Sequence, residues 1–444
     1  MTVRATGGPP AAHRTRARRA LIAGSVGNFI EWYEFGVYGC FATVFAANFF
    51  SGAGGDSGAG GTESLVKSYA SFALAFFFRP LGAALFGRAG DRFGRRPALV
   101  LALLLMTGST TAIGLLPTYA TLGAAAPWVL TAVRALQGLS AGGEFGGAVA
   151  LMTESAPPGR RGRYGAWQSF TVALGLLAGA GLAAGAATAL GPGALYDWGW
   201  RVPFLAALPL GLTALWLRLR LDETPAFQQT RRGGGAPRAG ALPAPPGEVL
   251  RAVVLGIGRI MGWSAAGYTF LVVLPAYLQH TLGATFQEAL AATVLADLGF
   301  ALTILPAGAL SDRVGRRPVM AAGAGLVVLL ALPLLAVLRS EGAPTAAKGL
   351  AVLLAGAVVG LMAGPGPAML AEMFPTRVRC TGLGLAYALA NAVFSGCAGL
   401  VITELGGRTA DPAVPAYYAM AACAVSVPAL LTLRADDHRR ALRD

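Results

Sequence analysis

The chain has 444 residues, of which 55% are hydrophobic and only 13% charged, and its net charge is +14. Soluble domains carry about a quarter of charged residues, so this composition excludes an ordinary soluble domain. The 62 glycines suit helices that pack closely in lipid, because small residues let two backbones approach each other. We therefore expect an all-α membrane protein.

Twelve apolar segments follow one another along the chain, each with the ~20 residues that a helix needs to cross a bilayer. They are predicted at Ala20–Asn48, Ser64–Gly87, Pro97–Pro117, Ala124–Thr153, Tyr164–Leu190, Trp200–Leu219, Val249–Gln279, Gln287–Leu310, Pro318–Leu338, Ala347–Ala371, Thr381–Glu404 and Ala413–Leu433. A stretch rich in Pro and Gly separates the sixth segment from the seventh and is predicted to be a flexible linker. The chain therefore divides into a tail (1–19), a six-helix bundle (20–221), the linker (222–248), a second six-helix bundle (249–433) and a tail (434–444).

A short polar motif occurs once in each predicted half. Asp91–Pro97 returns in the second half as Asp312–Pro318, and the two copies differ only at Phe93 and Val314. Internal repeats of this kind are typical of secondary transporters. Glu154 and Glu372 also match, because they follow the fourth and the tenth predicted span in the same way.

The matching charges predict either a gate that forms in one conformation or loops that serve only to orient the chain. In such a gate, Asp91 and Asp312 would hold Arg residues or helix N-termini of the facing half when the inner side is closed. We favour the gate, because loops that only orient the chain need no acidic residues. Its members would be Asp91, Arg92, Arg95, Glu154, Asp312, Arg313, Arg316 and Glu372.

Basic residues are distributed unevenly between alternate loops. With the N-terminus in the cytoplasm, 27 of the 35 Lys and Arg residues lie in or beside cytoplasmic segments and only five lie outside. Basic residues concentrate on the cytoplasmic side of membrane proteins, so both termini and the linker are predicted to be cytoplasmic, with the chain in the plasma membrane. This distribution also explains the high net charge, and we expect no nucleic-acid partner.

Seven ionisable residues fall deep inside predicted spans, where a charge costs roughly 2.5–3.5 kcal/mol unless it meets a partner or a wet cavity. They are Glu31, Glu34, Arg79, Arg134, Glu144, Arg259 and Asp297. Glu34 and Arg134 both lie near mid-span, so we expect them to pair and to carry the coupling proton. Glu31 shares a helix face with Glu34 and joins this proton-coupling group. A purely structural ion pair is the alternative.

Two further pairings involve the remaining arginines. Arg79 and Glu144 lie at similar predicted depth on the second and fourth spans, which predicts an ion pair. Arg259 is then the freest cation and the best candidate to bind a substrate carboxylate, since a guanidinium matches a carboxylate bidentately. The alternative is that Arg259 pairs with Asp297 on the eighth span.

Other polar side chains complete the candidate substrate site. Tyr268 lies further along the same predicted span as Arg259 and could join the site only if that helix bends near Gly262 or Gly267; otherwise it merely packs. The remaining candidates for substrate binding are Tyr38, Arg79 and Gln137.

Several segments of the first half resemble one family of transporters. They are Gly27–Gly39, Phe78–Gly82, Arg134–Glu144 and Trp198–Phe204. These segments look like helices one, two and four and the entry to helix six of the metabolite:proton symporter family of the major facilitator superfamily. The two loops with the pattern G-x-x-x-D-R-x-G-R-R resemble the loop between the second and third helices in each half of that superfamily. Glu34 is a departure, because the family more often has Asp there.

The resemblance implies the major facilitator fold, with twelve transmembrane helices in two pseudo-symmetric bundles and alternating access to one central site. It also implies proton-driven uptake of small organic acids or zwitterions, such as tricarboxylates, 2-oxoglutarate, shikimate, proline and betaine.

Other classes of function fit the sequence less well. A drug/proton antiporter of the same fold would be expected to have a Gly-Pro step in the fifth span, and none lies between Gly175 and Gly185. An enzyme needs a nucleophile and base or metal ligands, and the only histidines (His13, His280 and His438) lie in tails or a loop. We therefore predict a monomeric proton symporter of a small carboxylate-bearing metabolite, without cofactor or metal. A proline/betaine-type zwitterion is the alternative substrate.

Overall fold

The computed structural model describes residues 10–51, 62–93, 95–154, 156–157, 159–219, 246–375, 379–434 and 439. Among these residues the side chains of 10–24, 87–93, 95–96, 98–99, 151, 192, 246 and 380 are outside the description. The regular structure of the described chain is entirely helical, without a strand, and this confirms the all-α fold. Most of the predicted linker lies outside the described residues.

The first half contains six membrane-length segments, each coinciding with a predicted span. In chain order they are α1–α2–η1 (Pro10–Cys40, Ala42–Phe45 and Ala46–Phe50), α3 (Thr62–Phe93), α4 (Arg95–Leu115), α6–α7 (Ala125–Ala141 and Phe145–Glu154), α8 (Arg161–Ala189) and η2–α10 (Leu195–Gly199 and Arg201–Leu219), where η marks a π-helix. The short helices α5 (Tyr119–Leu122) and α9 (Pro192–Ala194) lie between them.

The second half repeats this arrangement with six more segments. They are α12–η3–α13 (Pro246–Gly267, Tyr268–Val273 and Leu274–Leu282), α14 (Phe286–Val314), α15 (Arg316–Arg339), α16–α17 (Thr345–Ala363 and Gly366–Met373), α18–η4–α19 (Arg379–Ala390, Asn391–Gly396 and Ala398–Thr409) and α20 (Val414–Leu431). Nine helical runs of the described chain are long and apolar enough to cross a membrane by length and composition alone.

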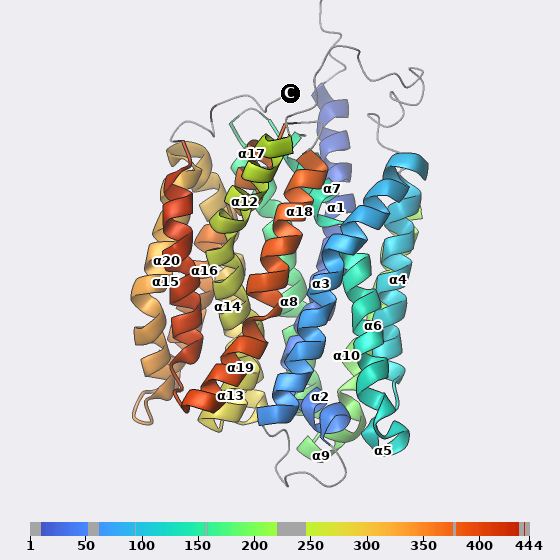
Figure 1. The fold of residues 1–444 in the computed structure, drawn as a ribbon, viewed down its shortest axis with the longest axis vertical. Coiled ribbons are helices and arrows are strands. Elements are labelled where there is room, and N and C mark those ends of the chain that lie inside the picture. Colours follow the sequence, from blue (N-terminus) through green and yellow to red (C-terminus); the bar gives the residue numbers. More distant parts are fainter. Residues whose placement is uncertain are drawn as a thin grey trace, which may run out of the picture.

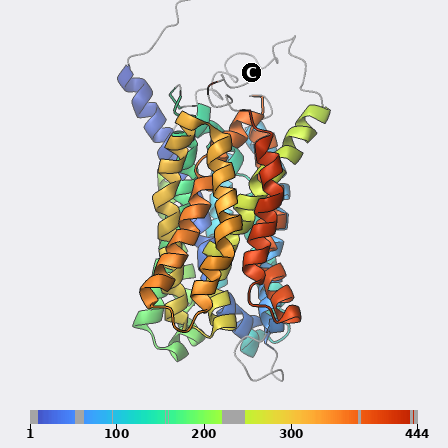
Figure 2. The same ribbon diagram turned by 90° about the vertical axis from the view of Figure 1, so that its left-hand side faces the viewer.

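The long helices run roughly side by side along one axis (Figures 1 and 2). The start of α1 and the end of α20 lie at the same end of the molecule, as an even number of spans requires (Figure 1). Following the predicted orientation, we call this end the inner side and the opposite end the outer side.

Glycines hold corresponding helix pairs together in the two halves. A Cβ atom at Gly138 of α6 would overlap the backbone carbonyl oxygen of Ala75 in α3. A Cβ atom at Gly356 of α16 would likewise overlap the carbonyl oxygen of Ala296 in α14. Gly138 and Gly356 are separated along the chain by the same number of residues as the matching glutamates, Glu154 and Glu372. Ala75 and Ala296 are separated by the same number of residues as the two copies of the charged motif. The sequence repeat is therefore also a repeat of helix packing.

The halves meet mainly where α8, in the first half, runs along α14, in the second. Several segments are interrupted near this interface. A turn over residues 142–144 separates α6 from α7, and the π-helices η3 and η4 interrupt spans seven and eleven. Short π-helical stretches in α-helices frequently mark functional sites.

Candidate functional site

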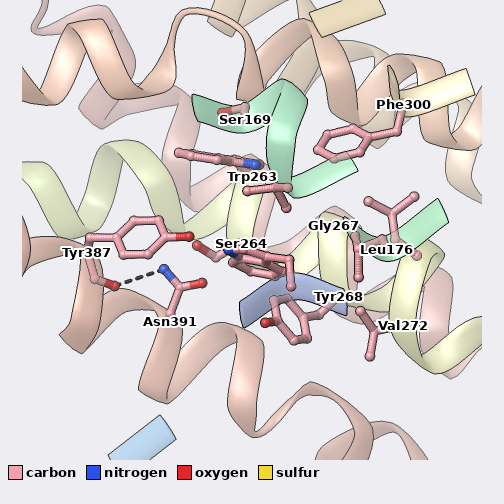
Figure 3. A pocket seen from close by; sticks show the side chains of 13 residues that line it. Ser169, Leu176, Trp263, Ser264, Gly267, Tyr268, Val272, Phe300, Tyr387 and Asn391 are labelled. Atoms are coloured by element: carbon pink, nitrogen blue, oxygen red, sulfur yellow. Dashed lines mark hydrogen bonds between the residues drawn. The ribbon is translucent and has the colours of Figure 1, made fainter. Parts of the chain in front are cut away.

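A cavity lies between the two halves (Figure 3). The first half contributes side chains from α1 and α8, and the second contributes residues from α12, η3, α14, α18 and η4. They are Trp32, Ser169, Val172, Leu176, Trp263, Ser264, Gly267, Tyr268, Leu271, Val272, Phe300, Tyr387 and Asn391. A central cavity shared by two halves is the expected site in an alternating-access transporter.

The lining is aromatic and uncharged. The ring centroids of Trp263 and Tyr387 are 6.1 Å apart, and those of Trp32 and Tyr268 are 6.0 Å apart. The side-chain amide of Asn391 donates a hydrogen bond of 2.9 Å to the backbone oxygen of Tyr387 (Figure 3). It also accepts one of 2.8 Å from Ser395. The site therefore offers ring faces and neutral polar groups.

The π-helix η3 brings Tyr268 into this lining. Tyr268 is the first residue of η3 and directly follows Gly267, one of the two positions where a bend was predicted. Its side chain is buried, yet its hydroxyl group has no hydrogen-bond partner among the described residues. A buried phenol without a partner has a donor available for a ligand.

The prediction that Arg259 binds substrate in this cavity is not supported by its geometry. Arg259 Nε donates to the backbone oxygen of Ala429 at 3.2 Å, and Nη2 donates to Thr432 at 2.8 Å. Both acceptors belong to the inner end of the last span, so the guanidinium points away from the cavity. The alternative Arg259–Asp297 pair is also absent, since both carboxylate oxygens of Asp297 lack a hydrogen-bond partner in the described structure.

Arg79 pairs with Glu31 instead of Glu144. Arg79 Nη2 lies 3.0 Å from Glu31 Oε1, and both side chains are buried. Glu144 pairs with Arg218 of α10 at 2.7 Å, and this pair fills the space that a side chain at Gly27 would need. The predicted Arg79–Glu144 pair is therefore wrong. The turn at residues 142–144 takes Glu144 out of the regular helix from which its depth and direction were extrapolated.

Glu34 and Arg134 are joined through Gln137 and do not form the direct ion pair that was predicted. Arg134 Nη1 donates to Gln137 Oε1, and Gln137 Nε2 donates to Thr110 at 2.6 Å and to Glu34 at 3.4 Å. Glu34 is completely buried, and its Oε1 atom has no hydrogen-bond partner among described residues. Gln137, predicted to contact substrate, therefore serves as the bridge in this chain of polar groups.

Arg134 and Tyr38 lie outside the cavity lining. The guanidinium of Arg134 stacks over the ring of Tyr38, 4.0 Å from its centroid, and Tyr38 donates a hydrogen bond to the backbone oxygen of Ser68. The rings of Phe45 and Phe72 stack against Tyr38 as well. Tyr38 therefore covers a buried cation, and its predicted role as a substrate ligand has no geometric support.

At the inner side, Asp312 connects the two halves. Its carboxylate accepts hydrogen bonds from the backbone N–H groups of Gly162, at 2.7 Å, and Arg163, at 2.9 Å. These are free amides of the first turn of α8, where partial positive charge attracts a carboxylate. Arg316 holds Asp312 from its own half at 2.8 Å.

Two ion pairs accompany this contact across the halves. Glu154 pairs with Arg379 at 2.6 Å, and Glu372 accepts Arg161 from the opposite half at 3.4 Å and Arg316 from its own half at 3.1 Å. The sequence repeat singled out the acidic members, whereas Arg161 and Arg379 were not among the predicted gate residues. Arg313 is exposed. The side chains of three other predicted gate residues are outside the described structure, and these are Asp91, Arg92 and Arg95.

The outer side is closed as well. Thr43 of α2 donates a hydrogen bond of 3.1 Å to Gln279 of α13, and the rings of Phe41 and Phe286 lie 5.5 Å apart. Both contacts join residues of different halves. Contacts between the two halves are therefore present on both sides of the cavity.

Comparison with known proteins places the chain in a family. Residues 20–238 match the family described as "Sugar (and other) transporter", and residues 254–443 match the family described as "Major Facilitator Superfamily". A proline/betaine transporter of Escherichia coli (strain K12) is 33% identical over 96% of this chain and 85% of that protein. An alpha-ketoglutarate permease of the same organism is 36% identical over 87% of each chain, and a citrate-proton symporter of Klebsiella pneumoniae is 34% identical over 90% of this chain and 88% of that protein.

A solved structure shows the same fold. The proton:xylose symporter XylE, bound to 6-bromo-6-deoxy-D-glucose, superposes with a TM-score of 0.75 at 19% sequence identity, covering 94% of this chain and 95% of the other. The twelve-span fold and the similarity of these relatives over most of the chain agree with the expected family. The protein is a multi-pass membrane transporter, not an enzyme, and it belongs to the metabolite:proton symporters of the major facilitator superfamily.

Proposed function

We propose that the protein imports a small zwitterion, carrying one carboxylate and one alkylated ammonium group, together with protons. Glycine betaine and proline have this chemistry. The observation that carries the proposal is the aromatic, uncharged lining of the cavity. Rings attract an alkylated cation through their electron-rich faces, by roughly 2 kcal/mol or more when water is excluded.

A zwitterion fits this lining better than a multivalent anion does. A citrate-like substrate brings two or three negative charges into the membrane, and each needs a cation or a set of donors to replace water. The cavity lining contains neither Lys nor Arg. A molecule with no net charge needs only one group to receive its carboxylate.

We assign the binding of that carboxylate to Tyr268 and Arg79. The unpartnered hydroxyl of Tyr268 belongs to the cavity lining and can donate to it. Arg79 lies just behind the lining, with its Cζ atom 5.7 Å from the ring centroid of Trp32. The Nε atom of Arg79 has no hydrogen-bond partner in the described structure, so the positive charge is only partly engaged by Glu31.

Glu34 is the group that we assign to proton coupling, with Arg134 attached through Gln137. An isolated charge at this depth is costly, and binding a proton to the carboxylate removes it. Glu31 lies one helical turn away and is neutralised by Arg79, which leaves Glu34 as the carboxylate with an open oxygen. Rearrangement of the Gln137 bridge would then connect the proton on Glu34 with the substrate site.

We infer the transport cycle from the contacts that join the two halves on both sides of the cavity. Breaking the Thr43–Gln279 and Phe41–Phe286 contacts opens the cavity to one side, and breaking the Asp312 and Glu154 contacts opens it to the other. The distribution of basic residues supports an orientation with both termini and the linker in the cytoplasm. In that orientation the chain works as a monomer that binds substrate outside and releases it inside.

Transport in proteoliposomes tests the proposal. Purified protein is reconstituted, and uptake of radiolabelled glycine betaine and proline is compared with that of 2-oxoglutarate and citrate under an inward proton gradient. We expect accumulation of a zwitterion, its loss when a protonophore is added, and little uptake of the di- and tricarboxylates. Accumulation of 2-oxoglutarate or citrate with no zwitterion uptake would contradict the substrate assignment and leave proton symport intact.

A further inference from the structure

Asp297 is a buried carboxylate that neither the substrate site nor the proton site uses. It lies in the middle of α14 with an exposed fraction of only 1%. Neither of its two oxygens has a hydrogen-bond partner among the described residues. The residue of the first half that corresponds to Asp297 is Phe76, because these two are separated along the chain by the same number of residues as Asp91 and Asp312. The repeated helix packing therefore needs no acid at this position, and the acid has another purpose.

The position of Asp297 lies between the cavity and the outer closure. Phe300, one helical turn further along α14, lines the cavity. Cys40, the last residue of α1 in the other half, is within electrostatic reach of Asp297. The next residue, Phe41, packs against Phe286 at the closed outer side. Asp297 therefore stands at the interface that has to separate when the outer side opens.

The surroundings of Asp297 offer it no compensating charge. Among the described residues, Cys40 of α1 interacts electrostatically with Asp297, and it is buried and carries no positive charge. On α16, Lys348 interacts with Glu288, at the outer end of α14. On α13, the ring of His280 contacts Thr62 of α3 at 3.5 Å. α8 also packs along α14, and its residues 173 to 187 include no ionisable residue.

We propose that Asp297 is a second proton-binding site and that the outer side closes only while its carboxyl group holds a proton. A carboxylate without a partner is costly in a dry interface, whereas the neutral acid is not. When the outer side is open, water can reach Asp297, which then takes up a proton and allows α1 and α14 to close together. The proton leaves to water again once the cavity opens to the inner side. This inference deepens the proposed function and depends on proton-coupled transport, but not on which substrate is carried.

Distances across the outer side test the inference directly. Lys67 at the outer end of α3 and Glu341 between α15 and α16 are exposed and belong to different halves. Both residues are replaced by cysteine in a protein whose four native cysteines have been replaced by alanine. The two new cysteines are spin-labelled, and the protein is reconstituted in lipid nanodiscs. Double electron–electron resonance then gives the populations with short and long distances from pH 5 to pH 9, in the absence of substrate.

In the parent protein we expect the long-distance, outward-open population to increase at least threefold as the pH rises, because Asp297 loses its proton. Asp297→Asn mimics the protonated acid and should hold the short distance at every pH, while Asp297→Glu should restore the response. Either a parent protein without a pH response or an Asp297→Asn variant with the parent's response would overturn the proposal. If Asp297→Asn does not fold, Asp297→Leu takes its place, because it too can neither bind nor release a proton and should hold the short distance at every pH.

Substrate binding is measured separately in the same samples. Glycine betaine should change the fluorescence of Trp32 and Trp263, which line the cavity. Absence of this change, with the pH response present, would contradict the zwitterion as substrate and leave the role of Asp297 standing. A fluorescence change without the pH response would contradict only the role of Asp297.

Discussion

Asp312 and Gly162 belong to different halves of the protein, yet the carboxylate of Asp312 accepts a hydrogen bond of 2.7 Å from the backbone N–H group of Gly162. The acid belongs to the repeated loop motif, and the amide belongs to the first turn of α8. A Cβ atom at Gly162 would overlap Arg316, so a larger residue would push the two halves apart at this point. The contact therefore depends on both the charge of Asp312 and the small size of its partner.

Replacing Asp312 by Asn should weaken the closed inner side. The amide side chain keeps the shape of the carboxylate but removes its negative charge, which interacts favourably with the N-terminus of α8. This interaction is worth about 1–2 kcal/mol, or roughly a factor of 5–30 in the ratio of the closed to the open inner side. Spin labels at Arg160→Cys and Arg317→Cys should show a larger population with a long distance across the inner side. Arg313→Gln, in the same loop but exposed, is the matched control. Equal distance distributions for Asp312→Asn and the control would show that the contact does not set the balance.

Replacing Glu34 by Gln should separate transport from the proton gradient. The variant cannot release a proton at this position, so we expect accumulation against a gradient to be lost while exchange of labelled for unlabelled substrate continues. Uptake and counterflow in the same proteoliposomes measure the two activities. Thr110→Val, which removes one hydrogen bond to the Gln137 bridge, should lower the rate without abolishing accumulation. Full proton-driven accumulation by Glu34→Gln would exclude Glu34 as the main proton carrier.

Trp263→Leu should lower the affinity for a zwitterion by about 2- to 30-fold, because the side chain loses a ring face worth roughly 0.5–2 kcal/mol to an alkylated cation. Trp263→Phe should retain most of the affinity. Titration calorimetry with glycine betaine measures both. Trp128 is 77% exposed on α6, and Trp128→Leu provides a control for the general effect of removing a tryptophan. An equal loss in the Leu and Phe variants would indicate a packing role for Trp263.

Glu144→Ala should destabilise the first half. The substitution leaves the guanidinium of Arg218, 7% exposed, without the carboxylate 2.7 Å away, and breaking such a buried pair costs about 3–5 kcal/mol. Thermal unfolding in detergent measures the change. The double variant Glu144→Ala with Arg218→Leu should be more stable than Glu144→Ala alone, because no charge is left buried. A double variant that is no more stable than the single one would contradict this explanation.

The twelve spans could be predicted because bilayer thickness fixes their length and hydropathy marks each one along the chain. The pairing of charges inside them could not be read in the same way. Glu144 follows a turn that breaks span four, and so it meets Arg218 instead of Arg79. Tyr268 reaches the cavity because η3 departs from regular α-helix geometry directly after Gly267, one of the two positions where the sequence allowed a bend. The sequence did not decide between a bent helix and a regular one in which Tyr268 only packs.

Other parts of the site leave little trace in the sequence. Trp263 and Tyr387 look like ordinary apolar residues of a membrane helix until the two halves are brought together. The partner of Asp312 is a pair of backbone amides, and every residue except proline has one. The repeat predicted the position of the acid, and its charge predicted an arginine or a helix N-terminus of the facing half as its partner. The sequence did not show which helix start this would be, and the structure identifies it as that of α8.

The glycine contacts repeated in both halves restrict how the protein can move. Where backbone touches backbone, as at Gly138 with Ala75 and at Gly356 with Ala296, two helices cannot slide or rotate past each other without collision. Each of these helix pairs must therefore travel as one stiff block. Motion during transport is left to the seams between blocks, above all where α8 meets α14, and to the π-helical joints at Tyr268 and Asn391. A substitution that enlarges either glycine would disturb assembly of its half, whereas one in a seam would change the speed of the cycle.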